Sequence, residues 1–314
     1  MISLRQHAIS IAAIFLALAI GVVLGSGLLS NGMLSGLRDD KAQLQSEIED
    51  LNDTNNRLTE QLIAADGFDA TVGDRIVRDT LAQRPVVVFT TPDTDPGALD
   101  ALQRTIGQAG GSVSGRVSLT ESFVDAVNGD QLRTLVTNVV PAGTQLRTGA
   151  VDQGSLAGDL LGSVLLLNPQ TAQPQTTPQE RVLALDTLRG GGFVEFDGDV
   201  QPGQLAVVLT GSGDPDNTSG NRGAVIARFA GALDGRGAGT VLAGPTTAAE
   251  GNGPIAVVRA DAALAAVLST VDDVDRVSGR ITTVLALQEQ LAGGTGRYGT
   301  GPGAAAVTVG AAQP

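Results

Sequence analysis

The chain has 314 residues, of which 42% are hydrophobic, so it holds enough apolar material for a folded core as well as a membrane segment. Its net charge of -13 argues against nucleic-acid binding, because nucleic-acid phosphates require a basic surface. Because it has no cysteine, disulfides and thiolate metal sites are excluded.

The first apolar segment, residues 8–29, is long enough to cross a bilayer as a helix. Arg5 lies before it, which predicts that residues 1–7 stay in the cytoplasm while the carboxyl side is exported. Gly21 and Gly25 have the small-xxx-small spacing that lets membrane helices approach each other. The residues expected to mark the anchor are Ala8, Leu16, Gly21, Gly25 and Leu29.

Two other interpretations of this segment stay open. Small residues at 25–27 would suit a signal-peptide cleavage site. The segment would also serve as a buried core helix. Its apolar length exceeds the about 7–15 residues usual in a signal peptide, which favours an uncleaved anchor.

A heptad repeat follows the apolar segment, with leucine at every d position from 37 to 58. This pattern predicts a parallel coiled-coil stalk over residues 34–65, forming a homodimer or a higher oligomer. Asn55 at an a position favours the dimer, because two facing amides satisfy each other only in register. An amphipathic helix packed on the chain's own globular part is the alternative. Gly67 is expected to end the helix. The predicted oligomerisation residues are Leu37, Leu44, Ile48, Leu51, Asn55, Leu58 and Leu62.

From residue 85 the pattern changes to short β-rich runs that alternate with helical stretches. The run 85–93 predicts a buried strand, 98–109 a helix and 111–119 a second strand, which together form a parallel βαβ unit. Further helices are expected over 131–140, 156–167, 179–188, 222–233 and 279–291, and further strands over 204–213, 239–245 and 254–260.

This alternation predicts the α/β fold class, with a Rossmann-like, doubly wound parallel sheet in an exported domain over residues 66–292. The pattern leaves open whether the two halves form one sheet or two. Residues 293–314 are rich in glycine and alanine, and partial disorder is expected there.

Few residues point to chemistry. Parallel sheets bind ligands beyond the carboxyl ends of their strands, which indicates the loops 90–95, 211–216 and 244–247. The glycine string 294–299 fits G-x-G-x-x-G but follows a helix, so it lacks the strand–turn–helix context of a dinucleotide site. His7 is the chain's one histidine and lies at the anchor, which removes histidine triads and zinc sites from the exported part.

Closely spaced aspartates occur at 93 and 95, at 214 and 216, and at 272, 273 and 275. The first two pairs have a spacing that suits a hard cation, although loop aspartates more often bond to local backbone groups. The sequence therefore predicts no catalytic, cofactor-binding or metal-binding residue, and no enzyme activity.

Several longer stretches resemble the mycobacterial copper transport protein B family of actinobacteria. They are the opening MISLRQHAISIAAIFLALAIGVVLGSG, VGDRIVRDTL (72–81), VSLTESFV (117–124), VVPAGTQL (139–146), VDQGSLAGDLLG (151–162), ARFAGAL (227–233), VVRAD (257–261), STVDDVDRVSGRITTVLAL (269–287) and YGTGPGA (298–304). The resemblance implies a pore-forming protein of the outer membrane, linked to copper efflux and copper resistance, with copper ions as the transported species.

The residue composition gives little support for a copper-binding site. Copper(I) prefers thiolate and thioether ligands and copper(II) prefers imidazole, whereas this chain has no Cys, one His and two Met. Continuous apolar strands interleaved with helices also differ from the alternating strands of an outer-membrane barrel. The alternative function is therefore a membrane-anchored, coiled-coil-dimerised envelope scaffold or binding module without channel activity.

Overall fold

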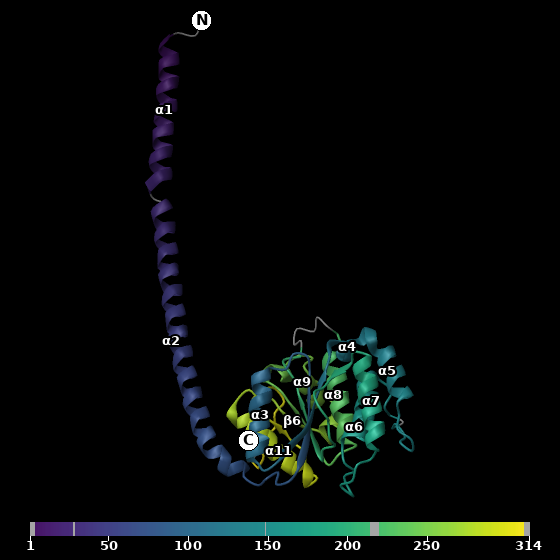
Figure 1. Cartoon of the computed structure of the whole chain (residues 1–314). Helices are drawn as coiled ribbons and strands as arrows, with labels where there is room; N and C mark the ends of the chain where they lie inside the picture. Colours follow the sequence, from purple (N-terminus) through teal and green to yellow (C-terminus); the bar gives the residue numbers. More distant parts are fainter. Residues whose placement is uncertain (1–3, 28, 148, 214–219, 311–314) are drawn as a thin grey trace. The chain divides into compact units, whose positions relative to one another are not determined.

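The computed structural model describes residues 4–27, 29–147, 149–213 and 220–310, and their side chains apart from those of Leu4, Leu24 and residues 26–38. The chain divides into two compact units, one up to Ala65 and one from Asp66 onward. The first unit consists of helix α1 (Leu4–Gly27) and most of helix α2 (Leu29–Val77), coloured purple to blue in Figure 1.

Helix α2 does not end at Gly67 as predicted but continues to Val77. A glycine inside a helix costs only about 1 kcal/mol relative to alanine, which tertiary contacts readily offset. Here Arg276 donates a hydrogen bond of 2.9 Å to Asp66, and the side chain of Val77 is fully buried in the second unit. These contacts stabilise the last turns of the helix.

The second unit is built on one seven-stranded sheet with the order β3-β2-β1-β4-β5-β6-β7. Every neighbouring pair is parallel except β2 and β3. One sheet therefore joins both halves of the α/β pattern, which settles the question that the sequence left open. The strands are β1 (Pro85–Thr90), β2 (Ser112–Leu119), β3 (Val194–Glu195), β4 (Leu205–Leu209), β5 (Thr240–Ala243), β6 (Ser269–Val271) and β7 (Arg297–Tyr298).

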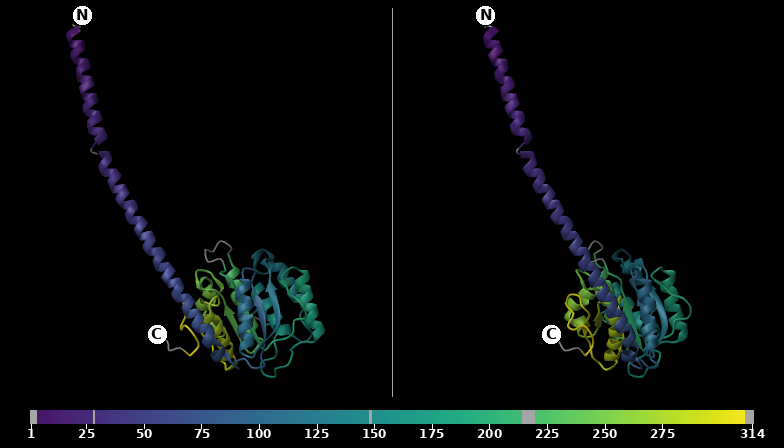
Figure 2. Two further views of the ribbon diagram at one scale, coloured as in Figure 1. Left: turned by 60° about the vertical axis from the view of Figure 1, so that its left-hand side comes forward. Right: turned by 90° about the vertical axis from the view of Figure 1, so that its left-hand side faces the viewer.

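Helices cover both faces of this sheet (Figures 1 and 2). The end of α2, α3 (Pro96–Gln108) and α11 (Val277–Leu291) lie on one face. The other face carries α5 (Gly129–Asn138), α6 (Gln153–Leu165), α7 (Pro178–Gly190), α8 (Arg222–Asp234) and α9 (Pro254–Ala260). Short helices α4 (Glu121–Val124) and α10 (Ala262–Ala265) and the 3-10 turns Ala126–Asn128 and Thr246–Ala249 complete the unit.

Strand β1 shows why its sequence reads as a continuous apolar run. Successive side chains of a strand point to opposite faces of the sheet. Val87 and Phe89 pack with the α6–α8 face, whereas Val86 and Val88 pack with the α3–α11 face. Because both faces are covered, every position must be apolar. The predicted βαβ unit of β1, α3 and β2 is confirmed.

Residues 254–260 form helix α9, so the predicted strand there is wrong. Pro254 occupies the first turn, where its missing N–H has no cost. Ile255 and Val258, about one turn apart, are both fully buried. The run PIAVVRA is short and apolar enough for either structure, and its packing against the core selects the helix.

The prediction of disorder beyond residue 293 is wrong for residues 293–310. Tyr298 lies in the edge strand β7 and is 7% exposed. The carboxylate of Asp272 accepts hydrogen bonds of 2.9 Å from the backbone N–H groups of Thr300 and Gly301. Arg259 donates a 2.8 Å bond to the carbonyl of Tyr298 and pairs with Asp272 at 2.6 Å. A buried ion pair thus fixes this segment to the sheet.

Candidate functional site

Helix α1 carries four of the five residues predicted to mark the membrane anchor. Residues 5–23 are long and apolar enough for a helix to cross a bilayer. Leu16 is 64% exposed, and Ala8, Gly21 and Gly25 are exposed as well. Leu29 begins α2, and its side chain lies outside the described ones. An apolar helix whose side chains are exposed in this way is suited to lipid or to another apolar helix.

The predicted oligomerisation residues lie on α2. Of these, Leu44, Ile48, Leu51, Leu58 and Leu62 are between 48% and 62% exposed, and Asn55 is exposed too. The side chain of Leu37 lies outside the described ones. The structure therefore presents an exposed apolar stripe, and its pairing with a second copy stays a prediction.

The loops expected at the carboxyl ends of the strands do meet in the second unit. The hydroxyl of Thr91 donates to Asp93 at 2.6 Å and accepts from the N–H of Gly211 at 3.2 Å. The other carboxylate oxygen of Asp93 accepts from the N–H of Gly213 at 2.9 Å. A 2.8 Å hydroxyl bond between Thr247 and Ser212 joins the third loop. Asp214 and Asp216 lie outside the described residues.

Both aspartates of the described pair, Asp93 and Asp95, accept hydrogen bonds from backbone groups. Besides the bond from Asp93 to Gly213, the carboxylate of Asp95 caps helix α3 by accepting from Ala98 N–H at 2.7 Å. Among the residues that the structure describes, no group of three or more His, Cys, Asp and Glu side chains is arranged to hold a metal ion. His7 lies in α1, away from these loops in sequence.

Asp273 is the exception, because its buried Oδ1 has no hydrogen-bond partner. The side chain follows β6 and is 3% exposed. Loss of solvation raises the pKa of Asp273 to about 6, and the neighbouring carboxylates of Asp272 and Asp275 add to the shift, while Arg276 opposes it. At neutral pH this carboxyl group is therefore mostly ionised although it is buried beside the start of α11, which is energetically unfavourable.

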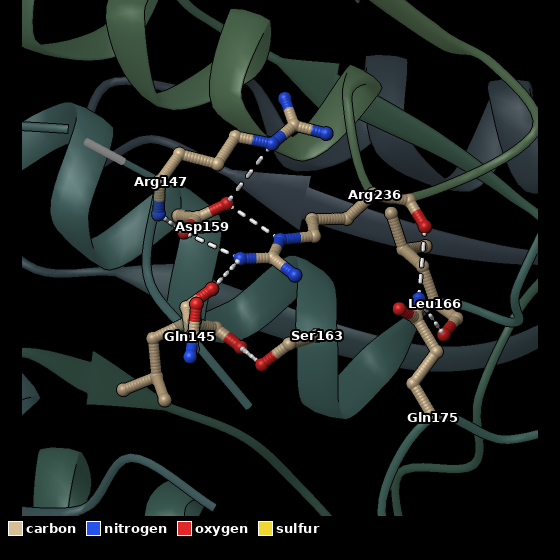
Figure 3. A network of polar contacts seen from close by, with 8 residues as sticks. Gln145, Arg147, Asp159, Ser163, Leu166, Gln175 and Arg236 are labelled. Carbon is tan, nitrogen blue, oxygen red and sulfur yellow. Dashed lines mark hydrogen bonds and ion pairs between the residues drawn. The ribbon is translucent and has the colours of Figure 1, made fainter. Parts of the chain in front are cut away.

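A polar network joins α6 to the turn after α8 (Figure 3). No short sequence motif indicates it. Asp159 on α6 is fully buried and accepts two bonds from Arg236, from Nε at 2.5 Å and from Nη2 at 2.7 Å. It also accepts the backbone N–H of Arg147 at 2.7 Å. Arg236 also donates a hydrogen bond of 2.7 Å from Nη2 to the backbone carbonyl of Gln145. One carboxylate on α6 thereby holds both the loop 145–147 and the turn that follows α8.

A cavity of about 630 Å³ lies beside this network, and Arg147, Arg228, Val151 and Leu264 contribute to its lining. Both arginine side chains are 48% exposed. The lining also includes Asp152, but its carboxylate already accepts the N–H groups at the start of α6. The cavity is therefore a mixed polar and apolar recess whose acidic groups chiefly stabilise the fold.

Sequence reasoning missed this network because its members are far apart along the chain. Asp159, Arg147 and Arg236 belong to α6, to the loop before it and to the turn after α8. A lone acid inside the apolar helix 153–165 was the one available signal, since a buried carboxylate requires a partner.

Comparison with known proteins places the whole chain in one group. The family described as "Copper transport outer membrane protein, MctB" matches residues 1–309. Proteins of Mycobacterium tuberculosis and Mycobacterium bovis, each named copper transporter MctB, are 50% identical over 313 residues, covering 98% of this chain and 99% of each relative. The Mycobacterium leprae copper transporter MctB is 49% identical over 316 residues, with the same coverage. These matches confirm the resemblance, and the chain belongs to the MctB family of copper transport outer membrane proteins.

Proposed function

We propose that this chain takes part in copper transport through the cell envelope and contributes to copper efflux and copper resistance. The observation that carries the proposal is the 50% identity, over nearly the full length, to proteins named copper transporter MctB. The similarity includes the apolar helix, the residues of the proposed stalk and the α/β unit alike.

The path for copper, in this proposal, is a pore made by α1 helices from several copies. The α/β unit is an unsuitable wall, because helices cover both faces of its sheet. Residues 5–23 are the segment suited to lipid, and Gly21 and Gly25 have no atom within 4 Å of where a Cβ would lie, which leaves room for a second helix.

Copper would pass such a pore without a tight binding site. Cysteine is absent from the sequence, and the single histidine, His7, lies in α1. In the described part of the chain, no three His, Cys, Asp or Glu side chains lie close enough together to hold a metal ion. An aqueous, weakly selective route, or an indirect role in transport, fits this donor set.

The proposed arrangement has residues 1–7 in the cytoplasm, an anchor over 8–29, a paired stalk over 34–65 and an exported α/β unit. We infer that this unit is Rossmann-like and doubly wound, since the chain moves outward from β1 in both directions, to β2 on one side and to β4 through β7 on the other. The family description points to the outer membrane. The described residues include one helix long and apolar enough to cross a bilayer, which is more typical of a cytoplasmic-membrane anchor.

A scaffold without channel activity is the second candidate. It is favoured by the small number of copper donors and by an α/β unit with converging loops at β1, β4 and β5. In this case the unit would bind an envelope component or a partner protein, and copper resistance would depend on it indirectly.

A copper-sensitivity experiment tests the transport proposal. A strain lacking the gene should accumulate copper and grow poorly in excess copper, and the full-length gene should restore both properties. A gene lacking codons 8–29, with an unrelated signal peptide in their place, should not restore them. Normal copper accumulation in the deletion strain would rule out a role in copper transport.

Planar bilayers then separate the pore from the scaffold. Purified full-length protein should give discrete conductance steps that disappear after denaturation. A protein that restores copper resistance in cells but gives no conductance would support the scaffold. Separation of cytoplasmic and outer membranes, followed by immunodetection, decides which membrane holds the chain.

A further inference from the structure

The part of α2 that belongs to the second unit, residues 66–77, has two different faces. On one face Gly73 and Val77 are buried, and a Cβ at Gly73 would lie 2.8 Å from Cδ1 of Ile281. On the other face Phe68 is 67% exposed and Ile76 is 48% exposed, with Val72 half-buried between them. We name Phe68, Val72 and Ile76 the apolar face of α2.

The exposure of Phe68 is unusual for this chain. Of its seven phenylalanines, four are fully buried and Phe196 is partly buried. Phe15 is exposed, but it lies in the apolar helix α1. An aromatic side chain left exposed beside two further aliphatic ones indicates a surface that another molecule covers.

The heptad repeat of the stalk continues into this face. Beyond Leu58 and Leu62 the next d and a positions are Ala65 and Asp69, followed by Val72 and Ile76. Asp69 lines a groove with α3 and α11 of its own unit. Phe68, one residue earlier, presents the apolar group at this level of the helix. Apart from Asp69 at one a position, apolar residues therefore continue the repeat to the last turn of α2.

We propose that a second copy of this chain covers the apolar face of α2, so that the dimer seam extends from the stalk into the globular unit. The inference rests on the paired stalk proposed above. Two copies anchored in one membrane leave it with the same polarity. A parallel pair that keeps the register of the stalk brings Val72 and Ile76 next to the same residues of its partner. The two globular units would then be held against the seam by their buried contacts at Gly73 and Val77.

Cysteine cross-linking tests the proposal directly, because the natural chain has no cysteine. Single variants of the full-length protein in detergent would be oxidised with diamide and separated on a non-reducing gel. Leu51→Cys reports on the stalk, and Val72→Cys and Ile76→Cys report on the apolar face. Thr71→Cys and Asp74→Cys are matched controls, since both residues are exposed on the same helix away from the repeat.

The expected result is a shift from monomer to dimer for Leu51→Cys, Val72→Cys and Ile76→Cys, with the two controls remaining monomeric. If Leu51→Cys forms dimers while the apolar-face variants behave like the controls, the extension is wrong and the stalk dimer stands. If no variant forms dimers, both are wrong. Dimers of the apolar-face variants without dimers of Leu51→Cys would contradict a continuous seam.

A second substitution guards against misfolding of the cysteine variants. Phe68→Asp, placed in the Val72→Cys background, should abolish the dimer band while the circular dichroism spectrum stays unchanged, because Phe68 is exposed in the single chain. Asp74→Asn in the same background should leave the band intact. Equal cross-linking in both double variants would overturn the role of the apolar face.

Discussion

The carboxylate of Asp159 is completely buried, and Arg236 compensates its charge. Two hydrogen bonds of 2.5 and 2.7 Å neutralise the carboxylate, and a third fixes the loop at Arg147. Removing one partner of a buried ion pair is costly because the other charge stays desolvated.

Asp159→Asn should therefore lower the free energy of unfolding by about 3–5 kcal/mol. The measurement is urea denaturation of the detergent-solubilised protein, followed by circular dichroism. Asp130→Asn is the matched control, because the Asp130 carboxylate is 87% exposed in its pair with Arg133 and should matter little. Equal stability of the two variants would show that the Asp159–Arg236 pair does not contribute to the free energy of unfolding.

Asp234 gives the second residue-scale prediction, which concerns pH. Loss of solvation raises the pKa of Asp234 to about 7. A backbone hydrogen bond from Thr240 and the charge of Arg147 lower it, but they do not outweigh the loss of solvation. Because the folded state holds this proton more tightly than the unfolded chain, the contribution of Asp234 to stability falls as pH rises from about 4 to about 7.

Asp234→Asn keeps an acceptor for the Thr240 N–H at 2.9 Å but has no proton to lose. The stability of the variant relative to the natural chain should rise as pH increases from about 4 to about 7 and stay constant above that, at about 1.4 kcal/mol per pKa unit at most. Thermal unfolding at a series of pH values measures this difference. A difference that does not change with pH would contradict the raised pKa.

Helix α6 contacts α8 through a row of glycines at 154, 158 and 162. A Cβ added at Gly158 would lie 2.4 Å from the carbonyl oxygen of Phe229, and one at Gly154 would lie 2.3 Å from that of Val225. The two helix backbones can approach this closely only because side chains are absent there.

Gly158→Ala should destabilise the protein by about 1–3 kcal/mol, because the backbone of α8 cannot move aside easily. Gly107→Ala is the control within helix α3, since no atom lies within 4 Å of its Cβ position and alanine favours helix by about 0.5–1 kcal/mol. Opposite signs for the two variants are expected in denaturant unfolding. Stabilisation by both would show that helix propensity decides at Gly158 and would contradict the close packing of α6 on α8.

How far the elements could be predicted from the sequence depended on their length and surroundings. The apolar strand β1 and the helix α3 carry a clear period and lie close to their predicted positions. Strand β6 has only three residues, Ser269–Val271, and its partner β7 has two, so neither shows a period. Their place in the sheet is set by pairing of β6 with β5 and of β7 with β6, which no local pattern encodes.

The candidate site followed the same rule. The loops after β1, β4 and β5 could be predicted to meet, because parallel strands bring their carboxyl ends to one edge of the sheet. The partners of Asp159 could not be predicted, since a hydrogen bond from Arg236 depends on how α6 packs on α8. The end of α2 was misjudged because its contacts with Arg276 outweigh the weak helix propensity of Gly67.

In the proposed arrangement, the whole molecule depends on α1 for its place in the membrane. Arginine at the centre of a membrane helix costs about 2.5–3.5 kcal/mol per residue in insertion. Leu16→Arg combined with Ile20→Arg should therefore move the protein from the carbonate-resistant membrane fraction to the soluble fraction. Leu16→Ile with Ile20→Leu should leave it in the membrane. Retention of the double-arginine variant would indicate that another part of the chain binds the membrane.

The central position of β1 in the sheet has a consequence for biogenesis. One edge of β1 pairs early with β2, but the other pairs with β4, so Val86 reaches its partner Leu205 only after both β2 and the helices α4 to α7 have been made. Until then a strand of valines and phenylalanine has a row of unsatisfied amides, the kind of nascent surface that aggregates. A chaperone that binds this segment until β4 has been made should therefore reduce aggregation and proteolysis of the emerging polypeptide.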